Sequence, residues 1–290
     1  MSYRVIVVIG AIGLAVAAIA ASATGQGKPP ATSVVFFDDF TGPAINRTHW
    51  NVIVTGRVVN NEQQAYVDSA ETIALVTGPQ AAGAANALLL RPLHRPGFTT
   101  SDGRSFDFLS GRINTRGKFE FTDGTAAARM KLSSGAGLWP AFWALGTGPW
   151  PATGEIDVME NVGERDWTSV ALHGPGYSGD TPLVKRQPFA APDNITNWHV
   201  YSVDWAPDEL VFKVDEVEIY RVTRAMVEKY GRWAFDNPKF LILNLALGGG
   251  FPNSVNRTKT PYFGLPESTV ELIKRGDAVT LVDWVRVTQH

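Results

Sequence analysis

Three acidic side chains fall within six positions of one apolar run, at Glu155, Asp157 and Glu160. Successive side chains of a β-strand point to opposite faces, so Glu155 and Asp157 share a face and Glu160 has the wrong parity. A β-bulge at 158–159 would return Glu160 to the acidic face. The octet 154–161 has no Lys or Arg to neutralise the row. Retaining glycosidases use two carboxyl groups about 5–5.5 Å apart, and two glutamates that lean inward over the shorter Asp157 could close most of the distance that four strand steps put between them.

The same octet also has a purely structural interpretation. A hydrophobic strand with one solvated acidic face is common in antiparallel sheets, and from these residues alone both interpretations stay open. A helix is disfavoured because the segment is short, lies between Gly154 and Gly163, and has apolar residues that alternate.

Aromatic residues precede the acidic run. In the segment 137–146, Trp139 and Trp143 share one parity if the strand is regular, so both would face the same way. Beside a carboxylate row they could form walls for pyranose rings; in the core of a sandwich they would serve packing alone. Downstream, His173 ends an apolar run before a glycine-rich loop, where it could hydrogen-bond a carboxylate or a sugar hydroxyl.

Other chemistries find no support in the sequence. The chain contains no Cys, and it has no Gly-x-Ser-x-Gly elbow, His-Glu-x-x-His pair, P-loop or dinucleotide-binding glycine motif. A formal net charge of −2 provides no basic stripe for nucleic acid, so we expect no nucleic-acid partner.

The pattern of elements predicts the fold class. Short alternating runs separated by Gly, Pro, Asn and Asp fill the chain after residue 33, and residues 224–230 are the best helix. Asp215 and Glu216 are predicted to form a two-residue hairpin turn. This spacing indicates an all-β protein with two antiparallel sheets in a sandwich. In the last strand Asp283 interrupts an apolar face, where a carboxylate needs hydrogen-bond partners or a cation.

The N-terminal residues indicate a targeting segment. Arg4 supplies a positive charge, residues 5–20 are almost wholly apolar, and residues 21–23 form a small-residue cleavage site. We therefore predict a secretory signal peptide at 1–23, a flexible lead-in at 24–33 and a single catalytic β-sandwich domain at 34–290. The predicted location is extracellular, without stable membrane association after cleavage; an uncleaved membrane anchor is the alternative.

Together these segments resemble glycoside hydrolases of family 16, and within them the bacterial endo-β-1,3-glucanases, or laminarinases. The resemblance rests on the run Glu155–Glu160 with its bulge, on the tryptophan-rich segment 137–146 before it and on residues 172–174 after it. Weaker matches lie at 198–208, 244–249 and 282–287.

The resemblance implies a β-jelly-roll sandwich whose concave sheet forms an open cleft. It implies Glu155 as the nucleophile, Glu160 as the general acid/base and Asp157 as the helper between them, with no cofactor needed for catalysis. It also implies a structural calcium ion on the convex face, held partly by Asp39 and Asp283, because oxygen ligands suit calcium.

Further residues are implied to contact the substrate. Asn61 and Glu62 match a family segment near the donor subsites, where the sugars on the non-leaving side of the scissile bond bind. The full set of implied substrate contacts is Trp139, Trp143, His173, Asn61, Glu62, Arg112 and Asn244.

The sequence also departs from the family pattern. Thr125 and Ala127 stand where the family often has Arg and Glu, and Phe251 stands where a Trp is frequent. These differences leave the acidic trio intact but bear on substrate choice.

The first hypothesis for function is a monomeric, endo-acting, retaining hydrolase whose partner is a β-1,3-glucan polysaccharide. The alternatives are a non-catalytic β-glucan-binding protein, or the same fold acting on another β-linked polysaccharide such as mixed-linkage glucan or galactan, or as a transglycosylase.

Overall fold

The computed structural model describes residues 32–55 and 59–289. The predicted signal peptide and most of the predicted lead-in lie outside the described residues, whereas Ser33 already belongs to the first strand, β1 (Ser33–Asp38). Within the described ranges, no helix combines the length and apolar character needed to cross a bilayer.

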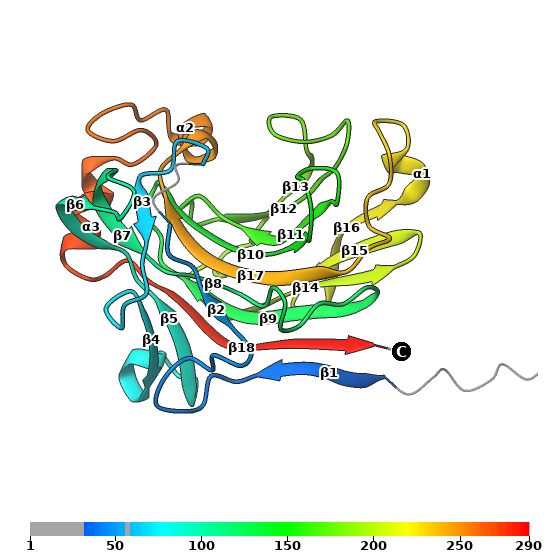
Figure 1. Cartoon of the computed structure of the whole chain (residues 1–290), viewed down its shortest axis with the longest axis horizontal. Coiled ribbons are helices and arrows are strands. Elements are labelled where there is room, and N and C mark those ends of the chain that lie inside the picture. Colours follow the sequence, from blue (N-terminus) through cyan, green and yellow to red (C-terminus); the bar gives the residue numbers. More distant parts are fainter. Residues whose placement is uncertain (1–31, 56–58, 290) are drawn as a thin grey trace, which may run out of the picture. The chain divides into compact units, whose positions relative to one another are not determined.

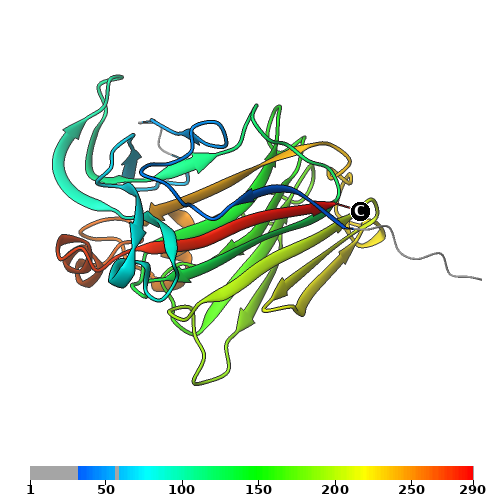
Figure 2. The same cartoon turned by 90° about the horizontal axis from the view of Figure 1, so that it is seen from below.

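One large sheet, which we call the convex sheet, forms the outer layer of the sandwich (Figure 1). It has eight strands, and β1 pairs with β18 beside the main path. Figure 2 shows β1, β18 and β9 running side by side across it. In spatial order the other strands are β16 (Val217–Thr223), β15 (Glu209–Val214), β14 (His199–Ala206), β9 (Gly124–Leu132), β18 (Thr280–Gln289), β5 (Asn86–Leu90) and β4 (Ile73–Thr77).

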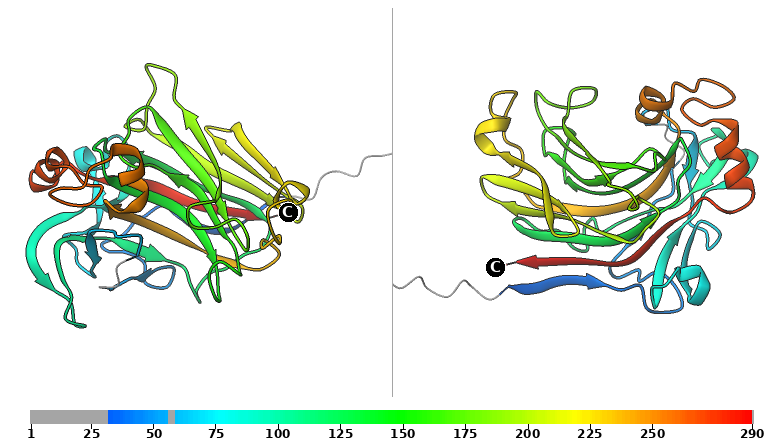
Figure 3. Two further views of the ribbon diagram at one scale, coloured as in Figure 1. Left: turned by 90° about the horizontal axis from the view of Figure 1, so that it is seen from above. Right: turned by 180° about the vertical axis from the view of Figure 1, so that it is seen from behind.

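The second large sheet, the concave sheet, has seven strands and curves away from the convex sheet, with loops rising at its ends (Figure 3). All of its strand pairs are antiparallel. In spatial order its strands are β13 (Leu183–Pro188), β12 (Trp167–His173), β11 (Glu155–Glu160), β10 (Leu138–Gly146), β17 (Lys239–Leu247), β8 (Arg112–Asn114) and β2 (Asn51–Val52).

Smaller elements lie at the periphery. A three-stranded sheet contains β3 (Gln64–Tyr66), β7 (Ser105–Ser110) and β6 (Leu93–Thr99). The short helices are η1 (Gly78–Ala81, a 3-10 turn), α1 (Arg224–Val227), α2 (Gly250–Asn256) and α3 (Glu267–Lys274). In Figure 1, α2 lies at one rim of the concave sheet and α1 at the other.

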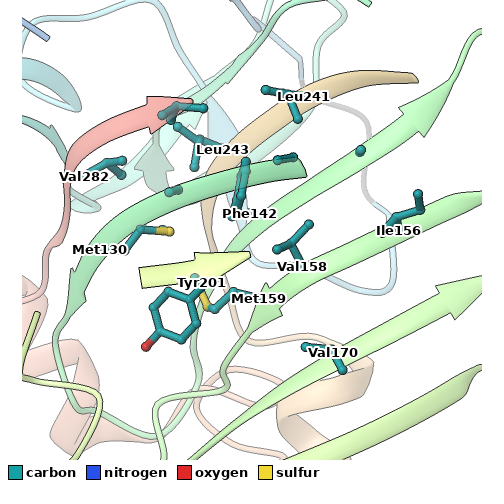
Figure 4. Packing of buried hydrophobic residues seen from close by; sticks show 14 of the residues in the cluster. Met130, Phe142, Ile156, Val158, Met159, Val170, Tyr201, Leu241, Leu243 and Val282 are labelled. Atoms are coloured by element: carbon teal, nitrogen blue, oxygen red, sulfur yellow. The ribbon is translucent and has the colours of Figure 1, made fainter. Parts of the chain in front are cut away.

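The main core fills the space between the two large sheets. Phe142 and Leu243 project into it from the concave sheet, and Met130, Tyr201 and Val282 from the convex sheet (Figure 4). Each strand contributes alternate residues to this layer, because successive side chains point to opposite faces. The predicted all-β sandwich of two antiparallel sheets is therefore confirmed.

Several local predictions can also be compared with the structure. The hairpin turn joins β15 to β16 with Asp215 and Glu216 at φ 49° and 68°, the left-handed values of a type I′ turn. The predicted helix 224–230 is only α1, followed by turns. The alternating residues at 117–122 predict a strand, but the N–H groups of Lys118 and Phe119 both donate to Thr115 O in a turn, so this prediction is wrong.

Candidate active site

The acidic trio lies on β11, near the middle of the concave sheet. Ile156, Val158 and Met159 are buried in the core between the sheets. Two consecutive core residues at 158–159 mark a bulge, and the pairing with β12 breaks between Asp157 and Glu160. The predicted bulge is confirmed, and it turns the Glu160 side chain to the face that Glu155 and Asp157 share.

Each glutamate of the trio accepts a hydrogen bond from one indole. Trp139 Nε1 on β10 donates to Glu160 Oε1 at 2.8 Å. Trp150 Nε1, from the loop that joins β10 to β11, donates to Glu155 Oε2 at 2.8 Å. These bonds fix one oxygen of each carboxyl group.

His173 completes the group from the neighbouring strand. It lies opposite Glu155 in the pairing of β11 with β12. Its Nε2 atom is 3.8 Å from Glu155 Oε1 and 3.3 Å from Asp157 Oδ2. The side chains of His173 and Glu155 keep exposed fractions of 14% and 16%, and that of Asp157 only 5%. The predicted site residue His173 is thus beside the trio.

The environment favours protonated carboxyl groups. Burial, followed by the charge of Asp157, raises the pKa of Glu155 to about 8. Burial also raises the pKa of Glu160, with the Trp139 hydrogen bond acting in the opposite direction. The pKa of Asp157 lies well above its usual value because of burial and the charge of Glu160. The ligand-free site therefore retains at least one proton near neutral pH, so it can provide both an acid and a carboxylate.

A second group of polar side chains adjoins the trio on the side of β10, β17 and β8. Trp143 Nε1 donates to Asn244 Oδ1 at 2.7 Å. The guanidinium carbon of Arg112 lies 4.9 Å from the centroid of the Trp143 ring and 5.8 Å from that of Tyr66. Trp143, Asn244 and Arg112 therefore lie together beside the trio, and their role as substrate contacts stays a prediction.

Glu62 belongs to the same region. Its Oε2 atom accepts a hydrogen bond from Gln64 Nε2 at 2.8 Å. Burial raises the pKa of Glu62, while its hydrogen bonds and the charge of Arg112 oppose that rise. Asn61 is different: its side chain is exposed and its carbonyl oxygen accepts from Gln63 Nε2. Both residues stay predictions as substrate contacts.

Asp39 and Asp283 are already occupied by protein donors. Asp39 Oδ1 accepts from the N–H and the hydroxyl of Thr41. Asp283 Oδ2 accepts from Arg129 Nη1 at 2.6 Å, and a guanidinium cation at that distance opposes binding of a metal cation. The donor set therefore fits a calcium ion poorly, and the calcium site stays a prediction.

Trp150 is a site residue that the sequence analysis missed. Its ring is 49% exposed and its centroid lies 6.1 Å from that of His173. A sequence feature could have pointed to it: Trp150 stands in a segment rich in Gly, Pro and Thr, where no core strand is expected to bury its ring. Its contact with Glu155 depends on the loop conformation, which no periodicity encodes.

Comparison with known proteins gives a consistent result. The family described as "Glycosyl hydrolases family 16" matches residues 47–263. The chain is 30% identical to a beta-glucanase of Rhodothermus marinus over 236 residues, 77% of this chain and 78% of that protein. It is 32% identical over 248 residues to glucan endo-1,3-beta-glucosidase A1 of Niallia circulans, covering 76% of this chain but only 34% of that longer protein.

A solved structure extends the likeness to three dimensions. The laminarinase catalytic domain of Thermotoga maritima superposes with a TM-score of 0.74 at 28% identity, covering 89% of this chain and 98% of that one.

Proposed function

The chain belongs to glycosyl hydrolase family 16, and from this premise we propose that it is an endo-acting, retaining hydrolase of β-1,3-glucans. The supporting relatives are named beta-glucanase, glucan endo-1,3-beta-glucosidase and laminarinase. The observation that carries the proposal is the bulge in β11, which gathers three carboxyl groups of raised pKa on the concave face.

The reaction proceeds in two displacements. Glu155 attacks the anomeric carbon while Glu160 gives its proton to the glycosidic oxygen, so that the leaving sugar departs and a glycosyl-enzyme forms. Glu160 then takes a proton from water, the water oxygen attacks the same carbon, and Glu155 is released as a carboxylate. Neither displacement calls for a cofactor, in agreement with membership of this family.

The neighbouring side chains support this assignment. Trp150 stabilises the carboxylate form of Glu155 by donating to Oε2, which opposes the rise of the Glu155 pKa through burial. Burial raises the pKa of Glu160 and so keeps a proton available for the leaving oxygen. We assign Trp143, Asn244, Arg112, Glu62 and Asn61 to the donor side, and Trp139 and His173 to contacts at the scissile bond.

Two substitutions test the catalytic roles. Glu155→Gln should lower kcat on laminarin by at least about a thousandfold, because the nucleophile has no substitute. Glu160→Ala should recover turnover on aryl glycosides with good leaving groups when azide is added. Azide rescue of Glu155→Ala in place of Glu160→Ala would reverse the two roles.

A polysaccharide panel tests the substrate class. Laminarin should release reducing ends fastest, with mixed-linkage glucan, agarose and xyloglucan slower, and early products should be oligosaccharides because the attack is internal. Binding of laminarin without any release of reducing ends would favour the β-glucan-binding alternative. Products longer than the substrate would favour transglycosylation.

We further propose that the protein is secreted as a monomer after cleavage following Ala23, with residues 34–290 as one catalytic domain. The apolar segment at 5–20 and the small residues at 21–23 support cleavage. Intact mass of protein from the culture medium and its sedimentation mass check both points; an intact Met1 would contradict the signal peptide.

The structural calcium ion implied by the family resemblance has a separate test. Equal metal content and equal Tm before and after EDTA treatment would contradict it.

A further inference from the structure

The concave sheet has two sides relative to the catalytic strand. The proposed donor contacts Trp143, Asn244 and Arg112 lie on β10, β17 and β8, on one side of β11. Strands β12 and β13 lie on the other side (Figure 3). A polysaccharide that crosses the trio from the donor side must continue over β12 and β13. The leaving-group sugars therefore meet side chains of these two strands.

Strand parity fixes which side chains those are. Val170 and Leu172 of β12 are buried in the core, so Trp167, Ser169 and His173 point to the concave face. On the edge strand β13, Arg186 lies opposite Ser169, and Ser169 in turn lies opposite Glu160. Directly paired residues share a face, so Arg186 also belongs to the concave face.

Arg186 and Trp167 form a stacked pair on this face. The guanidinium carbon of Arg186 lies 4.4 Å from the centroid of the Trp167 ring. No ion pair within 32–55 or 59–289 joins Arg186 to a carboxylate, so its donors can meet sugar hydroxyl groups. The two strand spacings from Glu160 to Arg186 amount to roughly 10 Å, which leaves room for the sugar attached to the oxygen that Glu160 protonates.

Building on the proposed function, we propose that Trp167 and Arg186 form an acceptor-side subsite for a neutral glucosyl residue of the leaving chain. The guanidinium covers one face of the indole and keeps its in-plane N–H groups for sugar hydroxyl groups, while the uncovered part of the indole contacts C–H groups of the pyranose ring. The pair determines how strongly the enzyme prefers polymer over substrates that lack an acceptor sugar.

The test compares two substrates that differ on the acceptor side only. Laminarin places glucose on both sides of the scissile bond, whereas an aryl β-laminaribioside places a nitrophenol where the leaving sugar would be. For Trp167→Ala and Arg186→Ala, the ratio of kcat/KM on laminarin to kcat/KM on the aryl substrate should fall roughly tenfold. Arg112→Ala, on the donor side, should lower kcat/KM on both substrates.

Lys185→Ala is the matched control. Lys185 is the neighbouring cation on β13, and its parity turns it to the opposite face, so its loss should leave the ratio unchanged. Equal loss on both substrates in Trp167→Ala would assign the pair a structural role in holding the edge strand. No change of the ratio in either variant would overturn the subsite.

A binding measurement separates this proposal from the catalytic one. In the Glu155→Gln background, calorimetry with laminarihexaose should show weaker binding when Trp167→Ala is added. If the wild-type protein cleaves neither substrate, the hydrolase assignment fails while the calorimetry still decides the subsite. Undiminished laminarihexaose binding in the double variant would refute it.

Discussion

At the scale of single residues, the site depends on a balance between burial and hydrogen bonding. Burial raises the pKa of Glu160, and the indole of Trp139 lowers it by donating to the carboxylate at 2.8 Å. Trp143, two pleats away on β10, donates instead to the amide oxygen of Asn244. The two tryptophans therefore share a face but act on different groups, one on the acid and one on a neutral amide.

This difference predicts a change in the pH profile. If Glu160 is the general acid, its pKa sets the alkaline limb of kcat/KM. Trp139→Phe removes a donor to the carboxylate form, which raises the pKa of Glu160 further, so the proton is kept to higher pH. The alkaline limb should move up by about one pH unit. Initial rates on laminarin from pH 4 to 10 measure it.

Trp143→Phe serves as the control for this profile. It removes an indole donor from the same strand, but its partner Asn244 does not titrate. KM should rise while the alkaline limb stays in place. A limb that moves equally in both variants would mean that general loss of aromatic burial, and not the bond to Glu160, sets the profile.

Sequence analysis reached much of this residue-level picture. Strand parity together with the spacing of the three acids predicts both the trio and its bulge. Glu155, Asp157 and Glu160 could therefore be identified from the sequence. The partner of Asp283 was not, because Arg129 lies 154 positions away in the chain and reaches it only through the pairing of β9 with β18. A contact of that kind is a property of the sheet order.

At the scale of elements, the entry to β11 is held by a neighbouring loop. Gly154 has a φ of 72°, and a Cβ atom there would come within 2.3 Å of Ala234 O. The buried ammonium group of Lys239 donates to Thr153 O at 2.8 Å and to Ala234 O at 3.1 Å. Arg232 donates to Ala152 O at 2.9 Å. Hydrogen bonds from the segment 232–239 therefore hold the loop that brings Trp150 to Glu155.

Gly154→Ala should disturb both stability and catalysis. The left-handed φ alone costs about 1–2 kcal/mol for a residue with a Cβ atom, and the contact with Ala234 O forces the backbone apart. Glu155 follows directly in sequence, so kcat on laminarin should fall together with Tm. Thermal unfolding and initial rates below the transition measure both effects.

Gly179→Ala is the matched control for this substitution. Gly179 also has a left-handed φ, 61°, yet no atom lies within 4 Å of its Cβ position. It should lose stability by the backbone term alone and keep kcat. Equal losses in the two variants would show that φ, and not the contact with residue 234, is decisive.

Some elements could not be predicted from the sequence, for physical reasons. β13 was missed because its residues Leu183–Pro188 are largely exposed on an edge, which leaves little hydrophobic alternation to detect. The helix α1 spans only four residues, whereas the sequence predicts 224–230. Thr223 caps its N-terminus, and turns follow Val227 in place of further helix. Periodicity reports burial, so elements with little burial escape it.

At the scale of the whole described part of the chain, residues 32–55 and 59–289, the main core couples the two large sheets. The face of the concave sheet opposite the trio is made of residues such as Ile156, Phe142 and Leu243, which pack with Met130 and Val282 of the convex sheet (Figure 4). The chain has no Cys, so no disulfide can supplement this packing. The curvature of the catalytic face therefore depends on the side chains behind it.

Phe142→Ala tests how far that packing and the chemistry are separable. Phe142 is fully buried on β10, while its neighbours Ala141 and Trp143 pair with catalytic strand β11. A cavity of this size costs about 3–5 kcal/mol of unfolding free energy, measured by urea denaturation. Phe37→Ala, the same change at a site 48% exposed on β1, should cost about 0.5 kcal/mol or less.

The catalytic consequence of Phe142→Ala is a separate measurement. If the core only supports the sheet, the folded fraction of Phe142→Ala retains its kcat on laminarin. A kcat that collapses while the fluorescence of the folded state persists would instead show that the position of β11 is set by the residue behind it.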